Sequence, residues 1–193
     1  EGEPEGGDNG DGDVVDAQAG AVPRQLTTYD GADGAPDGAS APAWSPDGRT
    51  IAYIRGGAPK LIYYGQQDLA LVPVSGGVPK ILTADYDRNV TQPAWSADGK
   101  WIYFTVEDDR TQVLARMPAD GGKIERVVDG RRVVENFSMS SGKIAVLNTT
   151  TEPPSTAFAL ECGTLAQPPH QTHPPRPPIH PARVHDPTAR PQD

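Results

Sequence analysis

Short runs of apolar residues alternate with clusters of Gly, Pro, Asp and Ser from residue 13 to about residue 165. Runs such as TIAYI at residues 50–54 and WIYFT at residues 101–105 are rich in β-branched and aromatic side chains. Such runs, when bounded by turn-forming residues, predict β-strands. The 21 Gly and 21 Pro among 193 residues argue against helices, because both residues break them. We therefore predict an all-β fold.

One phrase occurs twice in this region. PAWSPDGRTIAYI, residues 42–54, returns as PAWSADGKWIYFT, residues 93–105, so that Trp44 and Trp95 stand 51 positions apart. An apolar hairpin pattern with a Gly-Gly turn follows each copy. A repeat of this length suits one four-stranded blade of a β-propeller. The predicted strands are 41–45, 49–55, 68–74 and 78–83 in one unit, and 92–96, 100–106, 111–117 and 123–128 in the next.

The repeated phrase is explained by turn chemistry. Ser and Asp side chains bond nearby backbone amides, and Gly takes a positive φ at little cost, so each Ser-x-Asp-Gly predicts a tight turn between strands. We interpret the two aspartates as structural turn residues in preference to ligands, and we expect the two tryptophans to wedge between blades. The predicted structural blade motif consists of Trp44, Asp47, Gly48, Trp95, Asp98 and Gly99.

Two partial copies flank the complete units. Residues 13–27 match the hairpin alone, and residues 135–165 form a weaker unit in which Phe137 stands where the tryptophan stood and residues 140–143 replace the Asp-Gly turn. The fourth strand of that unit is expected after Gly163, where the pattern breaks off. We expect an incomplete β-propeller of about three WD-like, Tol-type blades, with open strand edges that favour self-association.

Composition divides the chain into an acidic disordered segment at 1–12, the partial propeller at 13–165, and a Pro/His-rich disordered tail at 166–193. The abrupt change suggests a truncated fragment whose tail is read in a shifted frame, although a natural disordered end would look similar. The net charge of −9 argues against nucleic acid or an anionic membrane as a partner. The chain carries no signal peptide or membrane-spanning run, which leaves a cytoplasmic or a periplasmic location open.

The WSPDG phrase, the Gly-Gly hairpin and the Leu-Thr strand ends at residues 26–27 and 82–83 resemble the N-terminal propeller of the prolyl oligopeptidase family of serine peptidases. The similarity is to its acylaminoacyl-peptidase and dipeptidyl-peptidase branches, and it covers about residues 13–165. Tol-type periplasmic propellers use the same blade. The resemblance implies a propeller that gates peptide substrates to an α/β-hydrolase domain, which is missing from this chain.

Catalytic chemistry is not indicated in these 193 residues. No G-x-S-x-G nucleophile elbow occurs, and Val74-Ser75-Gly76-Gly77, its nearest imitation, is predicted to be a hairpin turn. All four histidines, His170, His173, His180 and His185, lie in the tail. We therefore assign no catalytic, cofactor-binding or metal-binding residue, and we expect the chain to be inactive alone.

Four other features have a functional and a plain interpretation. Acidic residues 107–109 could hold a substrate amine, but a solvated loop is favoured. The DNGDGD segment at 8–13 resembles a calcium-binding loop but lacks EF-hand spacing, so a disordered acidic segment is favoured. A metal site among the tail histidines is disfavoured, and so is a reactive Cys162. The expected partners are peptides or the missing hydrolase domain. The alternative function is a Tol-type propeller that acts as a protein-binding module.

Overall fold

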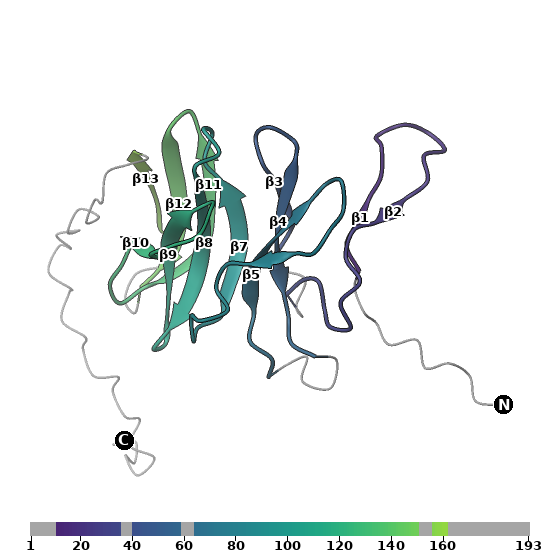
Figure 1. Ribbon diagram of the computed structural model, residues 1–193. Coiled ribbons are helices and arrows are strands. Elements are labelled where there is room, and N and C mark those ends of the chain that lie inside the picture. The colour runs from purple at the N-terminus through teal and green to yellow at the C-terminus, as the bar shows by residue number, and fades with distance from the viewer. Residues whose placement is uncertain (1–10, 36–39, 59–63, 151–155, 162–193) are drawn as a thin grey trace, which may run out of the picture.

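The computed structural model describes residues 11–35, 40–58, 64–150 and 156–161. Every regular element within these ranges is a β-strand, and the strands follow one another as an open arc of sheets (Figure 1). The all-β propeller architecture predicted from the sequence is thus confirmed. The strands are β1 (Asp13–Val14), β2 (Arg24–Gln25), β3 (Ala43–Trp44), β4 (Thr50–Arg55), β5 (Asp68–Pro73), β6 (Lys80–Ile81), β7 (Val90–Trp95), β8 (Trp101–Asp108), β9 (Thr111–Pro118), β10 (Glu125–Val128), β11 (Val133–Ser140), β12 (Lys143–Thr149) and β13 (Thr156–Glu161).

The strands group into units that match the sequence repeat. Strands β1 and β2 form a hairpin, β3–β6 form blade 1, β7–β10 form blade 2, and β11–β13 form blade 3. Within each blade, strands adjacent in the chain pair antiparallel. A parallel pairing between Val133 of β11 and Gln112 of β9 joins the sheets of blades 2 and 3. Each blade is therefore a meander, as the repeat length predicts.

The repeat is reproduced in the strand register. Trp44 pairs with Ile51 in blade 1, and Trp95 pairs with Ile102 in blade 2. The prediction of four strands is confirmed for both blades, but the fourth strand of blade 1 is short. Pro79 has no N–H to donate to a ladder, and Val78 is almost fully exposed, so regular pairing begins only at Lys80. The fourth strand expected after Gly163 lies outside the described residues.

Apolar side chains fill the spaces between the units. On β4, Ile51 and Tyr53 pack toward the β1–β2 hairpin together with Leu26, while Ala52 and Ile54 pack toward blade 2. Both faces of the strand are therefore buried, as its unbroken apolar sequence predicts. A third cluster, between blades 2 and 3, contains Tyr103, Leu114, Val128, Val134, Ile144 and Val146. The core of this protein is a series of layers between blades.

Polar contacts connect neighbouring units at their hairpin turns. The Arg24 guanidinium on β2 donates to the carbonyl oxygen of Val74, which follows β5 in blade 1. The Lys80 ammonium on β6 donates in the same way to the carbonyl oxygen of Asp120, which follows β9 in blade 2. A cation on the last strand of one unit thus reaches the turn of the next unit. The repeat therefore extends to the contacts between blades.

Candidate functional site

The two Ser-x-Asp-Gly turns have the same hydrogen bonds. In the first, Ser45 Oγ donates to Asp47 Oδ1 at 2.6 Å and accepts from the Thr50 N–H at 2.9 Å. In the second, Ser96 Oγ donates to Asp98 Oδ1 at 2.6 Å and accepts from the Trp101 N–H at 2.9 Å. These bonds within the turn occupy one carboxylate oxygen of each aspartate. The geometry is that of a structural turn.

Electrostatics and backbone conformation agree with this role. The hydrogen bond from the neighbouring serine, followed by one from a backbone N–H, lowers the pKa of both Asp47 and Asp98 below its ordinary value. Gly48 and Gly99 adopt φ values of 68° and 69°, in the left-handed region that glycine favours. Their role in the turn therefore explains the repeated phrase, without ligand binding by either aspartate.

The two tryptophans differ in their surroundings. The Trp95 indole packs against the core between blades 1 and 2, and its Nε1 donates to the carbonyl oxygen of Ala43 at 3.1 Å. Trp44 is 51% exposed. Our prediction that both side chains wedge between blades is therefore wrong for Trp44. The β1–β2 hairpin beside blade 1 is two-stranded, and the described residues include no further strand of that unit to cover this indole.

The Leu-Thr strand ends have a definite structural role. Thr83 Oγ1 accepts a hydrogen bond from the Leu69 N–H at 2.9 Å and lies 3.0 Å from Asp68 Oδ1. Thr27 Oγ1 accepts from the Gly12 N–H at 2.7 Å in the corresponding hairpin. Both threonines are buried. The hydroxyl therefore closes the end of each hairpin where the ladder lacks a backbone acceptor.

The acidic residues 107–109 do not form the solvated loop that we expected, because Glu107 and Asp108 end β8 and pair with β9. Asp108 is occupied by the protein's own arginines. The Arg88 Nε donates to Asp108 Oδ1 at 2.8 Å, and the Arg126 guanidinium binds Asp108 Oδ2. These hydrogen bonds, first from Arg88 and then from Arg126, lower the pKa of the Asp108 carboxyl. The side chain of Glu107 contacts Asn89 Nδ2 at 3.4 Å. With both oxygens of Asp108 engaged, this carboxylate is not offered as a binding site for a substrate amine.

A half-buried acid that the sequence analysis missed, Asp33, lies between the hairpin and blade 1. Both carboxylate oxygens of Asp33 and the Tyr53 hydroxyl are enclosed, and none of the three has a hydrogen-bond partner of acceptable geometry among the described residues. Burial raises the pKa of Asp33; the nearby Thr27 hydroxyl partly offsets this, and the charge of Asp11 adds to it. Burial also raises the pKa of Tyr53, and the charge of Asp33 reinforces that shift.

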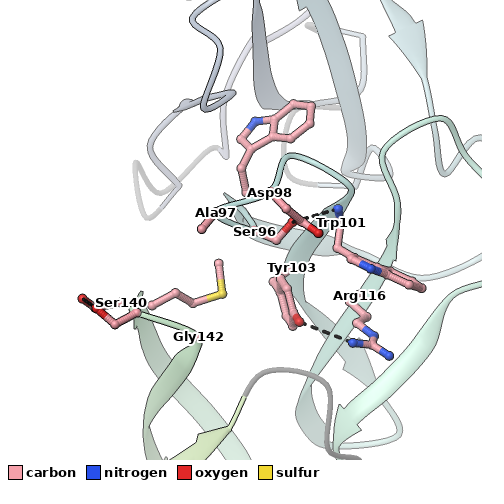
Figure 2. A pocket seen from close by; sticks show the side chains of 11 residues that line it. Ser96, Ala97, Asp98, Trp101, Tyr103, Arg116, Ser140 and Gly142 are labelled. Atoms are coloured by element: carbon pink, nitrogen blue, oxygen red, sulfur yellow. Dashed lines mark hydrogen bonds between the residues drawn. The ribbon is translucent and has the colours of Figure 1, made fainter.

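An open groove between blades 2 and 3 is the candidate binding site (Figure 2). Its cavity volume is about 410 Å³. Blade 2 contributes the Ser96–Asp98 turn and three side chains of β8 and β9, namely Trp101, Tyr103 and Arg116. Blade 3 contributes Met139 and the turn at residues 140–142, and Trp95 of blade 2 also lines the groove. The groove is thus walled by aromatic and sulfur-containing side chains and rimmed by hydroxyls and one carboxylate.

The polar end of the groove is built around Arg116. Its guanidinium stacks on the Trp101 ring at 4.2 Å and pairs with Glu125 Oε2 through Nε at 3.1 Å and Nη2 at 3.0 Å. The remaining nitrogen, Nη1, lies 3.5 Å from the Tyr103 hydroxyl, at the limit of a hydrogen bond. The Arg116 Nη1 group and the Tyr103 hydroxyl are therefore two donors that lie side by side at this end of the groove, and the contact between them is weak. Such a pair is suited to binding an oxygen acceptor.

The sequence analysis named Trp95 and Asp98 only as structural blade residues. It missed Trp101, Tyr103, Arg116 and Met139, because it treated their strands as plain core. One signal was present. Arg116 interrupts the apolar strand TQVLARMP, whose two faces both pack against neighbours. A charge in such a strand requires a partner, because an unpaired buried charge is costly. The partner is Glu125 on the adjacent strand, and the pair could have been proposed from their expected register.

Several predictions fall on residues outside the described part of the chain. They concern the four histidines of the tail, Cys162 and residues 8–10, the first half of the DNGDGD segment. Within the described ranges no group of three or more metal-ligating side chains occurs, and no helix there is long and apolar enough to cross a membrane. The segment Val74-Ser75-Gly76-Gly77 lies in the β5–β6 turn as predicted, where the Gly76 N–H bonds the carbonyl oxygen of Pro73 at 2.9 Å.

Comparison with known families decides the assignment. The sequence model of the family described as the lipoprotein LpqB beta-propeller domain matches residues 12–148, which is more than half of the chain. The chain belongs to this family. The match begins at the β1–β2 hairpin and ends in β12, so the family's unit comprises the repeated blades described above.

The predicted resemblance to peptidase propellers is also confirmed. Dipeptidyl-peptidase 5 of Trichophyton equinum is 34% identical over 82 residues, which are 42% of this chain and 11% of that protein. This member of the LpqB propeller family thus spans about a tenth of the length of the curated peptidases that it matches.

Two solved structures share the fold. TolB from Acinetobacter baumannii superposes with a TM-score of 0.54 at 19% identity, covering 74% of this chain and 33% of that one. The Pyrococcus horikoshii acylaminoacyl peptidase superposes with a TM-score of 0.54 at 16% identity, covering 77% and 21%. At these identities the two structures show the propeller fold alone.

Proposed function

We propose that this chain is a non-catalytic propeller segment that gates peptides to a serine peptidase domain. The observation that carries the proposal is the 34% identity to dipeptidyl-peptidase 5, over a stretch that is 42% of this chain. The 193 residues contain no G-x-S-x-G segment, and every histidine lies in the range 166–193. A serine nucleophile needs a histidine held at hydrogen-bond distance, so the blades supply binding and access, and the hydrolase domain supplies the chemistry.

A second candidate function is a binding propeller that works without an attached enzyme. The match to the lipoprotein LpqB propeller family and the fold shared with TolB favour it. In this case the groove between blades and the exposed surface around Trp44 would contact another protein. Exposed aromatic side chains at the edge of a sheet also favour self-association, which we propose for this chain and which sedimentation at several concentrations would reveal.

The experiment that separates the two functions is to sequence the gene across the codons for residues 155–193 and beyond, in all frames. The peptidase proposal predicts a frame that restores a Leu-Thr strand and continues to a G-x-S-x-G segment with downstream Asp and His. A verified stop codon with no hydrolase sequence beyond it would overturn that proposal and leave the stand-alone binding propeller.

A further inference from the structure

The groove between blades 2 and 3 has the chemistry of a site for an extended proline-rich segment. Such segments bind between aromatic side chains, and their backbone carbonyls accept hydrogen bonds from donors on the groove wall. Trp95, Trp101 and Tyr103 supply aromatic surface, and Met139 lines the same groove from blade 3. The Tyr103 hydroxyl and Arg116 Nη1 are the converging donors. The groove therefore offers both components of this recognition mode.

The charges at the groove favour a basic ligand with neutral acceptors over an acidic one. Arg116 is already neutralised by Glu125, and Asp98 stands at the rim with its pKa lowered, so that it is ionised at neutral pH. A carboxylate ligand would meet the negative charge of Asp98. A peptide carbonyl bound to the Tyr103 hydroxyl, with a basic side chain placed near Asp98, meets no such repulsion.

The chain itself carries a segment of this chemistry. Half of the residues from 168 to 181 are proline, and Pro174-Pro175-Arg176-Pro177-Pro178 places an arginine between two proline pairs. Proline at this density favours the extended polyproline II conformation, whose carbonyls are free to accept hydrogen bonds. The segment therefore offers carbonyl acceptors for the groove's donors and a basic side chain for Asp98.

The last described strand ends close to the groove. Glu161 at the end of β13 pairs with Lys143 at the start of β12, and Gly142, the residue before Lys143, lines the groove. The six residues 162–167 separate Glu161 from Pro168, and an extended chain covers roughly 3.3 Å per residue. The connection is therefore long enough to reach the groove from Glu161.

We propose that the segment Pro168–Pro181 binds in the groove between blades 2 and 3 of its own chain, with a backbone carbonyl accepting from Tyr103 and with Arg176 beside Asp98. The proposal concerns occupation of one surface by the chain itself and treats residues 168–181 as native, so saturable binding would count against a shifted reading frame and with it against the peptidase proposal.

The test compares nitrogen-labelled full-length protein with a variant in which Pro174, Pro175, Pro177 and Pro178 are replaced by alanine. We expect the Trp101 indole signal and the backbone amide signals of residues 140–142 to shift in this variant. Replacement of Pro187 and Pro191 by alanine is the matched control and should leave those signals in place. Unchanged groove signals in the four-proline variant would overturn the proposal, as would shifts that depend on protein concentration, which would indicate a second copy as the occupant.

A synthetic peptide of residues 167–182 completes the test. Added to the four-proline variant, it should bind saturably and shift the same signals, and Tyr103→Phe should weaken that binding about fivefold, as expected for one lost hydrogen bond. Tyr53→Phe removes a buried hydroxyl away from the groove and should not change the affinity. Equal binding of the peptide to the wild-type chain and to the four-proline variant would contradict occupation by the chain's own segment.

Discussion

The indole Nε1 of Trp95 donates a hydrogen bond to the carbonyl oxygen of Ala43, 3.1 Å away, and thereby links the first strands of two neighbouring blades. A second hydrogen bond between blades 1 and 2 runs from the Gln92 N–H to Ser40 Oγ at 2.9 Å. Gln92 has a φ of 55° at an irregularity in the β7–β8 pairing, which frees its N–H from the ladder. Blade packing is therefore fixed by specific bonds as well as by apolar area.

Because Trp95 takes part in the contact between blades 1 and 2 and Trp44 does not, we predict unequal effects of removing the two tryptophans. Trp95→Ala should reduce the free energy of unfolding by about 3 kcal/mol, because it opens a cavity between blades and leaves a carbonyl without its donor. Trp44→Ala should cost less than about 1 kcal/mol, since that indole is half exposed. Urea denaturation of both variants checks this. Equal losses would show that Trp44 is covered in solution.

The turn glycines give a prediction about backbone conformation. Gly48 has a φ of 68°, and a Cβ added there would meet no atom within 4 Å, so substitution affects the backbone conformation without a steric clash. Gly48→Ala should cost about 1 kcal/mol. Gly48→Asn is the matched control and should cost less, because asparagine tolerates the left-handed region. If alanine and asparagine were equivalent in thermal denaturation, the positive φ would not be the source of the cost.

Asp33 should make the protein less stable as the pH rises. Burial raises the pKa of its carboxyl above the ordinary value of 3.8, so the stability associated with the protonated form is fully present below 3.8 and is lost as the pH rises through the folded-state pKa. The groups around it are Asp11, Thr27, Tyr53 and Arg55.

The Asp33→Asn variant isolates this effect. It should match the wild-type protein near pH 3.5 and exceed it at pH 7 by about 1 kcal/mol, since an unpaired buried charge costs more than a neutral amide. Melting temperatures measured from pH 3.5 to pH 7 check the prediction. A wild-type protein that is more stable than Asp33→Asn at pH 7 would show that the carboxylate has a partner.

Asp108 should have the opposite pH dependence. Hydrogen bonds from Arg88 and Arg126 lower the pKa of its carboxyl, so its contribution is present above pH 3.8 and is lost as the pH falls through the folded-state pKa. Asp108→Asn should therefore be less stable than the wild-type protein at pH 6, with the difference shrinking below pH 3.8. Asp87 contacts Arg88 from a fully exposed position, so Asp87→Asn is the control and should have little effect. A pH-independent difference for Asp108→Asn would contradict the ion-pair explanation.

The parts of this fold that could be predicted from sequence are those governed by local chemistry. The Asp47 and Asp98 turns, the Gly-Gly hairpins and the alternation of Ile51 and Ala52 depend on residues near one another in the chain, so the pattern determined them. The environment of Trp44 depends on a neighbouring unit, and the motif alone does not indicate whether that unit is present. The Arg116 groove depends on how two blades diverge at one end, a tertiary property that no repeat encodes. The same holds for Asp33, which lies in a loop between units.

The central claim is that these blades supply peptide access without supplying the chemistry of cleavage. The most direct measurement is to incubate the purified full-length chain with a mixture of peptides and follow the products by mass spectrometry, with an active dipeptidyl peptidase as the positive control. Our account predicts that every peptide is recovered intact. Reproducible hydrolysis that a serine-directed inhibitor abolishes would contradict it.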